Sequence, residues 1–546
     1  MKSGGQLIVD ALTAFGTRRV FCVPGESYLP VLDALYDSSI ETTVCRQEGG
    51  AAIMAEATGK LSGEPGICLV TRGPGATNAS AGIHIASQDS TPMILLIGQI
   101  AINRRHREMF QEVDYQQFFG GMTKWVAEIE SADRVPEMMS RAWHIATGGR
   151  PGPVVLVLPE DMLRQQADVA SIKNVSTTQT WPGTDQLQQM QQMIEQAERP
   201  LAIVGGSRWS KDAAKQFESF AERFSLPVAC SFRRQMLFDH SHTHYAGDVG
   251  LGINPSLKAC IKTTDLLILL GARFSEIPSQ DFELLEVPVP QCDLIHIYPD
   301  ANELGKLYVP TLAINASSDV FCSALAPLKP KAPKLREKYI ATLHQSYKDW
   351  SSLEHALETA DTMSSVMSHL IESLPTDSIL CNGAGNYSTW IHRFYPFKQY
   401  GTQLAPTSGS MGYGLPAAIA AKLAEPEKTV LAFAGDGCFQ MTMQEFGTAV
   451  EFGAAVIVLL VDNGMYGTIR MHQEQNFPGR ISATNLFSPD FAALAQSYGA
   501  FGATVERGED FANAFNDALN STGPALIHIK VDPDAITPTL SLASMQ

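Results

Sequence analysis

Two polar turns in the last third of the chain contain the residue types that a metal and phosphate site requires. Gly435-Asp436-Gly437 and Asp462-Asn463-Gly464 each follow an apolar run, and Asp436 and Asn463 are 27 residues apart. This spacing fits a strand–helix–strand unit, which predicts that both side chains lie at the same edge of a parallel sheet. A carboxylate and an amide oxygen suit Mg²⁺ that also holds the phosphates of a ligand. Taken singly, each tripeptide is an ordinary turn, so only the pair predicts a site.

A parallel sheet is needed to position these turns, and the pattern of apolar residues elsewhere in the sequence predicts such sheets. Short continuous apolar runs such as PVVLVLP, LLILLGARF and AVIVLLV alternate with helix-like stretches such as GGAAIMAEATGKL. Runs of this kind, without polar alternation, are typical of strands buried on both faces of a parallel sheet. We therefore expect the α/β class, with doubly wound parallel sheets.

The length of the chain and two polar stretches predict three such domains. At about 100–200 residues per domain, 546 residues correspond to about three. The polar stretch 165–186 and the Pro- and Lys-rich stretch 327–339 are expected to be linkers. The predicted domains are listed here in chain order: 1–165, 186–326 and 355–535.

The composition indicates a globular protein and disfavours several kinds of partner. The chain is 45% apolar and 18% charged, and its net charge of −17 argues against a nucleic-acid partner. Nine scattered cysteines without a C-x-x-C pair predict reduced thiols in a cytoplasmic protein. The N-terminal stretch does not have the pattern of a signal peptide, and no apolar run reaches the ~18 residues of a membrane span.

The pair Asp436 and Asn463 resembles the diphosphate-binding motif of thiamine diphosphate enzymes. Seven segments, in chain order, resemble the acetolactate (acetohydroxyacid) synthase-like branch of that family, and the similarity spans all three domains, from about residue 4 to 535. The resemblance implies a pyrimidine-binding domain, a central domain and a diphosphate-binding domain, with thiamine diphosphate and Mg²⁺ as cofactors. It also implies a homodimer or homotetramer with active sites between subunits. The segments are VPGESYLPVLDAL, RQEGGAAIMAEATGK, TRGPGATNASAGIHIASQDSTPMILLIGQ, FQEVDY, RPGPVVLVLPEDM, GSMGYGLPAAIAAK and GDGCFQMTMQEFGTAV.

The resemblance assigns the catalytic acid/base role to Glu48, which would hydrogen-bond the aminopyrimidine ring of the cofactor and favour its imino tautomer. Gln47 stands where the family usually has His. By the same resemblance, the carbonyl of Gly409 accepts a hydrogen bond from the cofactor's amino group, and Met411 lies between its two rings. Without the flanking glycines, Met411 would be interpreted as a core residue.

The other expected site residues also follow from the resemblance. The Mg²⁺ ligands would be the side chains of Asp436 and Asn463 and the carbonyl of Met465. Two of the expected cofactor contacts, Asn386 and Tyr387, depart from the usual Gln and His. The full set of further cofactor contacts is Gly25, Asn78, Ala384, Gly385, Asn386, Tyr387, Gly437, Cys438, Gly467 and Thr468.

The substrate pocket and the central domain show further departures. The resemblance places Glu26, Phe110, Gln111 and His472 at the substrate pocket. Synthases usually have Gly at the position of Glu26, and at the position of His472 they have a Trp that selects the second substrate. Gly205-Gly206 and the segment 271–274 resemble flavin contacts. The central domain is therefore a candidate site for FAD or another nucleotide, although such glycines also form tight turns.

The function implied is decarboxylation of a pyruvate-like 2-oxo acid and transfer of the resulting acyl unit to a second carbonyl compound. A lyase with the same cofactor is the alternative: a 2-oxo acid decarboxylase, a 2-hydroxy ketone lyase or a 2-hydroxyacyl-CoA lyase. A non-catalytic binding or regulatory relative is disfavoured because Glu48, Asp436 and Asn463 are all present. A nicotinamide dehydrogenase is disfavoured because no G-x-G-x-x-G follows a strand with an acidic residue ~20 positions on.

Overall fold

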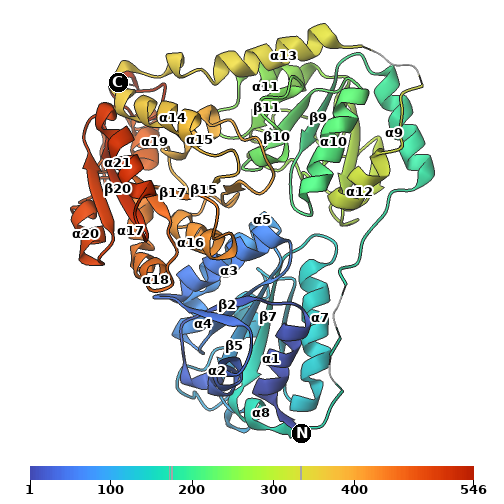
Figure 1. Cartoon of the computed structure of the whole chain (residues 1–546). Coiled ribbons are helices and arrows are strands. Elements are labelled where there is room, and N and C mark those ends of the chain that lie inside the picture. Colours follow the sequence, from blue (N-terminus) through green and yellow to red (C-terminus); the bar gives the residue numbers. More distant parts are fainter. Residues whose placement is uncertain (171, 174–175, 332–334, 546) are drawn as a thin grey trace. The chain divides into compact units, whose positions relative to one another are not determined.

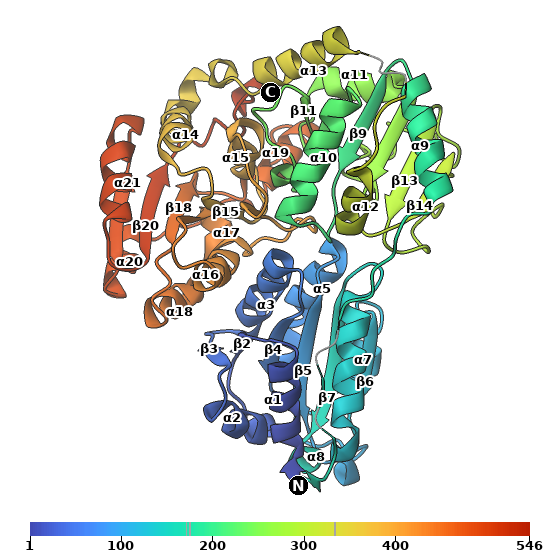
Figure 2. The ribbon, with the colours of Figure 1, turned by 45° about the vertical axis from the view of Figure 1, so that its right-hand side comes forward.

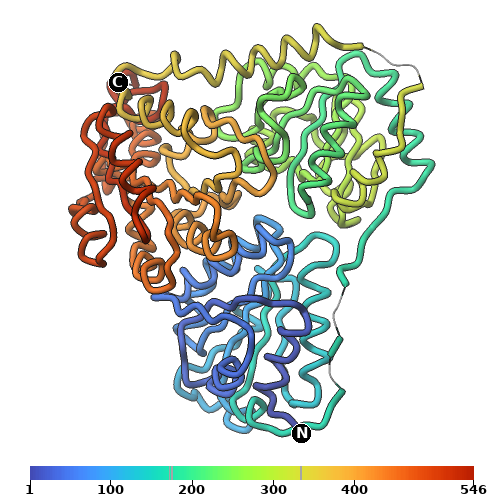
Figure 3. Tube along the Cα trace, in the orientation of Figure 1, coloured from blue at the N-terminus to red at the C-terminus, as the bar shows by residue number. Residues whose placement is uncertain are grey.

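The computed structural model describes residues 1–170, 172–173, 176–331 and 335–545. Residues 171, 174–175 and 332–334, which fall in the two expected linkers, lie outside this part. The described chain forms three six-stranded sheets, and it completes each one before starting the next (Figures 1 and 3). All strand pairs within these three sheets are parallel. The expected three-sheet α/β architecture is confirmed.

The first sheet has the strand order β3-β2-β4-β5-β7-β6. Its strands β4, β5 and β7 are buried along their whole length, which explains why their sequences are continuously apolar. A short antiparallel pair, β1 (Lys2–Ser3) with β8 (Gln166–Ala167), stands apart from the sheet. The bounds of the sheet strands are β2 Arg19–Cys22, β3 Glu41–Val44, β4 Gly66–Val70, β5 Met93–Gln99, β6 Trp125–Glu128 and β7 Pro153–Pro159.

Helices cover the first sheet on both faces. One face packs with α1, α2 and α7 around a core that includes Leu7, Ile94 and Leu156, whereas α3 and α5 pack together against β4 and β5. Helices α4, α6 and α8 are short. The bounds are α1 Gly4–Ala14, α2 Leu29–Tyr36, α3 Glu48–Ser62, α4 Pro74–Asn78, α5 Ser80–Asp89, α6 Tyr115–Phe119, α7 Val135–Thr147 and α8 Glu160–Arg164.

The second sheet has the order β11-β10-β9-β12-β13-β14, and helices flank it on both sides (Figure 2). Its strands are β9 Pro200–Val204, β10 Val228–Ser231, β11 Tyr245–Val249, β12 Leu266–Leu270, β13 Asp293–Tyr298 and β14 Leu312–Asn315. The helices of this region are α9 Thr184–Gln196, α10 Lys211–Arg223, α11 Pro255–Thr263, α12 Ser318–Leu325 and α13 Glu337–Trp350.

The third sheet has the order β16-β15-β17-β18-β20-β19, so β17 and β18 are neighbours. Its strands are β15 Ile379–Asn382, β16 Gln403–Leu404, β17 Val430–Gly435, β18 Ile457–Asp462, β19 Phe501–Val505 and β20 Ala525–Lys530. The helices are α14 Asp361–Ser373, α15 Ser388–Phe394, α16 Gly414–Ala424, α17 Asp436–Gln440, α18 Phe446–Glu451, α19 Gly467–Asn476, α20 Phe491–Ser497 and α21 Phe511–Leu519.

The contacts group the chain into two compact units. Unit 1 comprises Met1–Thr178, Pro406–Glu427 and Thr442–Val456, and unit 2 comprises Gln179–Ala405, Lys428–Met441 and Ile457–Gln546. Unit 1 thus holds the first sheet together with α16 and α18, and unit 2 holds the other two sheets. No disulfide joins the described cysteines. No helix in the described part combines the length and the apolar composition that a membrane crossing requires.

Candidate active site

Glu48 is the first residue of α3, and its carboxylate is held in place by α4 within unit 1. Its Oε2 accepts a hydrogen bond from the side-chain amide of Asn78 at 3.0 Å. A Cβ added to Gly75 would lie 3.2 Å from Oε1, so the backbone of α4 passes close to the carboxylate. Gln47 caps the helix by accepting hydrogen bonds from the backbone N–H groups of Gly49 (2.5 Å) and Gly50 (3.2 Å). The structure therefore places Glu48 and Asn78, two separately predicted site residues, in contact and gives Gln47 a structural role.

A second carboxylate, Glu445, supports the same helix start and was not foreseen from the sequence. Glu445 is fully buried and accepts hydrogen bonds from the backbone N–H of Arg46 (3.2 Å) and of Gln47 (3.0 Å). The hydroxyl of Thr448 donates to it at 2.7 Å. Burial raises the pKa of Glu445, while these hydrogen bonds act in the opposite direction. The residue lies in the GDGCFQMTMQEFGTAV segment, but only the fold shows that it reaches the residues just before Glu48.

The residues expected at the cofactor and substrate pocket collect around the carboxyl ends of β2, β4 and β5. A Cβ added to Gly25 would lie 2.4 Å from the Cβ of Thr71, and one added to Gly73 would lie 2.7 Å from that of Gln111. Gly25 and Gln111 therefore both contact the segment that leads into α4. Phe110 is 72% exposed, and Glu26 is also exposed.

The segment 408–412 contains the residues expected to contact the cofactor rings. Gly409 and Gly412 have positive φ angles of 69° and 79°, a conformation that favours glycine. The Thr442 hydroxyl donates to the carbonyl of Gly412 at 2.8 Å. Met411 is only half-buried, which disfavours its interpretation as a core methionine.

In unit 2, Asp436 and Asn463 occur where the spacing predicted. Strands β17 and β18 are parallel neighbours with Gly435 paired to Val461, so Asp436 and Asp462 follow at the same level and Asn463 lies one residue beyond. Asn463 Oδ1 accepts from the Met465 N–H at 3.2 Å, and the Met465 carbonyl accepts from the Gly467 N–H at 2.9 Å. Each of these oxygens retains a second lone pair for another partner.

The electrostatics of this edge suit a cation. Burial raises the pKa of Asp436 to about 7, and the neighbouring carboxylate of Asp462 acts in the same direction. Burial alone would also raise the pKa of Asp462, but hydrogen bonds from His528 (2.8 Å) and Ser488 (2.9 Å) outweigh it and lower that pKa to about 2. A divalent cation beside Asp436 would stabilise its ionised form. Among the described residues no group of three His, Cys, Asp or Glu side chains could hold a metal.

The remaining predicted cofactor contacts assemble around the same edge. The Asn386 N–H donates to Thr468 Oγ1 at 3.1 Å, and this hydroxyl donates to Asn386 Oδ1 at 2.9 Å. The Tyr387 hydroxyl lies 3.2 Å from Cys438 Sγ and accepts a hydrogen bond from the Gly383 N–H at 3.1 Å. Gly385 and Gly435 both pack against the Tyr387 ring.

Four further predicted site residues lie elsewhere on the loops and helices of unit 2. A Cβ added to Gly437 would lie 2.7 Å from the Tyr466 ring, and one added to Gly467 would lie 2.9 Å from the amide nitrogen of Asn463. His472 is exposed on α19, four residues after Thr468 and therefore on the same helical face. Ala384 precedes Gly385 in the loop after β15.

The glycines that resemble flavin contacts have a structural explanation. A Cβ added to Gly206 would lie 1.9 Å from the carbonyl oxygen of Gly271, so the ends of β9 and β12 pack backbone to backbone. The indole N–H of Trp209 donates to the Gly205 carbonyl at 2.8 Å. These glycines do not by themselves indicate a flavin, and FAD binding stays a prediction.

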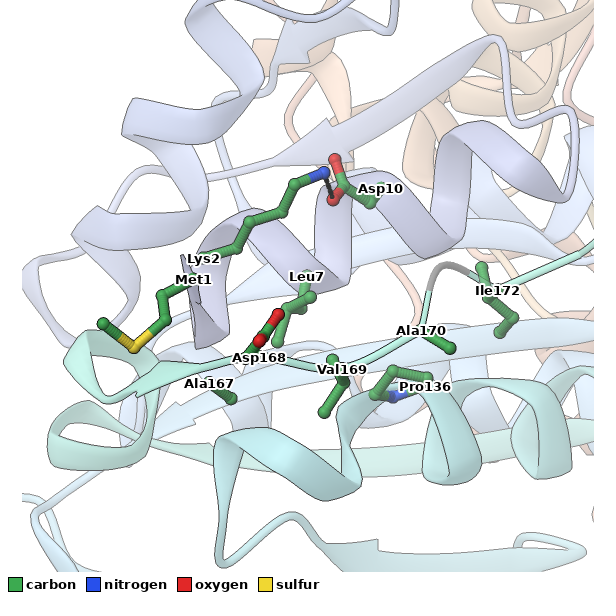
Figure 4. A pocket seen from close by; sticks show the side chains of 10 residues that line it. All are labelled: Met1, Lys2, Leu7, Asp10, Pro136, Ala167, Asp168, Val169, Ala170 and Ile172. Carbon is green, nitrogen blue, oxygen red and sulfur yellow. Dashed lines mark hydrogen bonds and ion pairs between the residues drawn. The ribbon is translucent and has the colours of Figure 1, made fainter.

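A separate hollow lies near the N-terminus of unit 1 (Figure 4). Lys2 and Asp10 form an ion pair of 2.6 Å beside it. None of the predicted site residues lines it. The lining residues are Met1, Lys2, Leu7, Asp10, Pro136, Ala167, Asp168, Val169, Ala170 and Ile172.

Comparison with known proteins agrees with this geometry. Three models of the thiamine pyrophosphate enzyme family match the chain: the N-terminal TPP binding domain at residues 2–118, the central domain at 187–325 and the C-terminal TPP binding domain at 383–529. The acetolactate synthase isozyme 2 large subunit of Escherichia coli (strain K12) is 30% identical over 97% of this chain and 96% of that protein. The probable acetolactate synthase large subunit of Methanocaldococcus jannaschii is 31% identical over 98% of this chain and 93% of that protein. This chain belongs to the thiamine pyrophosphate enzyme family and, within it, to the relatives of acetolactate synthase large subunits.

Proposed function

We propose that this protein is a thiamine diphosphate-dependent carboligase of the acetolactate synthase type. It would decarboxylate a pyruvate-like 2-oxo acid and transfer the acyl unit to a second carbonyl compound. The observation that carries the proposal is the environment of Glu48, whose carboxylate is oriented by Asn78 at 3.0 Å and lies at the start of α3. When bound, thiamine diphosphate would supply the stabilisation of negative charge that removal of CO₂ requires.

Glu48 acts as the acid/base in this proposal. The hydrogen bond from Asn78 fixes one carboxylate oxygen and leaves the other for a ring nitrogen of the cofactor. Glu445 holds the backbone N–H groups of Arg46 and Gln47, so the helix start carrying Glu48 is constrained from both sides. A fixed carboxylate can exchange a proton with the aminopyrimidine ring without first being ordered.

Asp436 and Asn463, with the Met465 carbonyl, would hold Mg²⁺ and through it the diphosphate. The raised pKa of Asp436 supports this assignment because a nearby cation would relieve the cost of its ionised form. The nearby Thr468 and Asn386, which hydrogen-bond each other, are polar groups within reach of the same edge. This part of the proposal concerns binding of the cofactor and not the chemical step.

A lyase that uses the same cofactor is the second candidate. It is favoured by the exposed polar side chains of Glu26 and His472 at positions where synthases usually carry Gly and Trp. We also propose a homodimer or homotetramer with active sites between subunits, supported by the family resemblance and measurable by analytical ultracentrifugation. Cytoplasmic location stays a prediction from the cysteine pattern.

The test is incubation of the purified protein with thiamine diphosphate, Mg²⁺ and a panel of 2-oxo acids, followed by measurement of CO₂ and identification of products. A product that joins two carbonyl compounds supports the carboligase, and a free aldehyde as the main product supports the lyase. Glu48→Gln is the matched control, since it should bind the cofactor but lose most of its turnover. Absence of cofactor binding by the native protein would refute both candidates.

A further inference from the structure

A buried polar cluster lies along α3, beyond the catalytic end of the helix. The Lys60 side chain is 3% exposed, and those of Glu56 and Asp89 are fully buried. Lys60 Nζ forms ion pairs with Glu56 at 3.0 Å and with Asp89, and it donates to the Tyr413 hydroxyl at 3.1 Å. An ammonium group has three N–H donors, and these three acceptors match them.

The cluster reaches the two ends of the segment 408–412. Tyr413 donates its hydroxyl proton to Glu56 Oε2 at 2.7 Å, directly after the segment. Thr407, directly before it, donates to Asp89 Oδ1 at 2.5 Å. Lys60 bonds to both acidic residues, so one buried cation connects the anchors on either side of Gly409 and Met411.

The segment itself depends on such anchors. Its two glycines at positive φ leave its backbone with little intrinsic preference for one conformation. The Gly412 carbonyl accepts from Thr442, and within the segment the hydroxyls of Ser408 and Ser410 contact each other at 2.9 Å. The anchors at Thr407 and Tyr413 therefore fix where the loop begins and ends.

The cluster also lies on the helix that carries Glu48. Glu56 follows Glu48 by eight residues, which is about 12 Å along an α-helix. Asp89 ends α5, and the residue that orients Glu48, Asn78, lies in α4 just before that helix. A Cβ added to Gly82 would lie 2.5 Å from the Cβ of Ala52, so α5 and α3 are closely packed.

We propose that Lys60, through Glu56 and Asp89, is a positioning residue that fixes the segment 408–412 on the helix whose first residue is Glu48. The inference rests on the proposed function for its kinetic consequence, but not for its structural one. Charge-assisted hydrogen bonds inside a protein are strong and directional, so removal of the cation releases both anchors together. A loop displaced by about 1 Å is expected to lower turnover up to about 100-fold while substrate affinity changes little.

Two variants test the proposal by removing different members of the hydrogen-bonded cluster. Lys60→Met removes the cation, whereas Thr407→Val removes one anchor and leaves the cluster intact. Thr407→Ser retains the hydroxyl and should restore the native behaviour. Thr264→Val is the control, because Thr264 is also a buried residue and its hydroxyl donates a hydrogen bond to the Arg199 carbonyl at 2.6 Å in the central region.

The first measurement is amide hydrogen exchange of the peptide covering 408–414 in the protein without ligands. We expect at least tenfold faster exchange in Lys60→Met and Thr407→Val, and native rates in Thr407→Ser and Thr264→Val. If Lys60→Met does not fold, the pair at Thr407 decides alone. Native exchange rates in folded Lys60→Met and Thr407→Val would overturn the proposal, as would equal acceleration in Thr407→Ser and Thr407→Val.

The second measurement is turnover at saturating thiamine diphosphate and Mg²⁺. We expect kcat to fall about tenfold in Thr407→Val and up to about 100-fold in Lys60→Met, with KM for the 2-oxo acid within threefold. A kcat within twofold of native in both variants would overturn the kinetic part. If the native protein turns over no 2-oxo acid, the proposed function fails, and the exchange measurement still decides whether Lys60 positions the segment.

Discussion

Glu445→Gln isolates the contribution of one buried carboxylate to the start of α3. The native carboxylate accepts from the N–H groups of Arg46 and Gln47 and from the hydroxyl of Thr448. Glutamine has nearly the same shape but only one accepting oxygen. Its amide N–H₂ group would face one of these donors.

The expected free-energy cost of Glu445→Gln follows from the interactions that the substitution removes. Loss of one charge-assisted hydrogen bond costs about 1.5–3 kcal/mol, and loss of a negative charge at a helix N-terminus costs about 0.3–1 kcal/mol. Part of this free-energy cost is offset because burying an amide costs less than burying a carboxylate. A net cost of about 2 kcal/mol corresponds to roughly 30-fold more frequent opening of the helix start.

The assay is amide hydrogen exchange of a peptide that covers residues 44–50, together with turnover. We expect roughly 30-fold faster exchange and a kcat at least tenfold lower, since Gln47 directly precedes Glu48. Glu451→Gln is the control: this side chain is 50% exposed and pairs with the side chain of Arg46, so its loss should cost at most about 1 kcal/mol. Exchange within threefold of native in a folded Glu445→Gln would refute the reasoning, and so would an equal effect of Glu451→Gln.

Four further predictions follow from the site and the fold. Glu48→Gln should retain thiamine diphosphate, but hydrogen–deuterium exchange at the C2 position of the cofactor and turnover should both slow by about 10²–10⁴-fold. Unchanged C2 exchange would exclude Glu48 as the activating acid. Asp436→Ala should lose the cofactor on gel filtration while its circular dichroism stays native, and retention of cofactor through EDTA treatment would contradict the metal assignment. Burial lowers the pKa of His296 from 6.5 to about 4, so the unfolded chain takes up this proton first as the pH falls. About 3 kcal/mol of stability, present above pH 6.5, should be lost as the pH falls through 4, and His296→Gln should flatten this part of the melting-temperature profile; an identical profile would show that another group dominates. His472→Trp should leave consumption of the donor within severalfold and shift the product ratio toward larger apolar acceptors in a competition assay, by at most the ~1–3 kcal/mol that one methylene is worth; a fixed ratio would remove His472 from the acceptor side.

The sequence by itself determined the class of the fold and predicted the candidate site residues. Continuous apolar strands such as β4 and β7 show the strand type in their own composition, because a strand covered on both faces has no polar side. The spacing of Asp436 and Asn463 predicted neighbouring strands, because a parallel pair requires a crossover of about this length. The resemblance named Glu48 and Asn78 separately, and the structure adds that the Asn78 amide donates a hydrogen bond to the Glu48 carboxylate.

Only the tertiary structure decided which distant residues support that site. Glu445 lies almost 400 residues after Gln47, with a sequence separation of 398, and no local pattern marks it as the acceptor for that residue's N–H. In the sequence Lys60 is likewise indistinguishable from any other helix residue, and only the structure shows that Asp89 and Tyr413 contact it. Sequence patterns predict local backbone geometry and the buried, apolar face of each helix or strand. The partners of a buried charge are set by how the elements pack, because burial makes an unpaired charge too costly to keep.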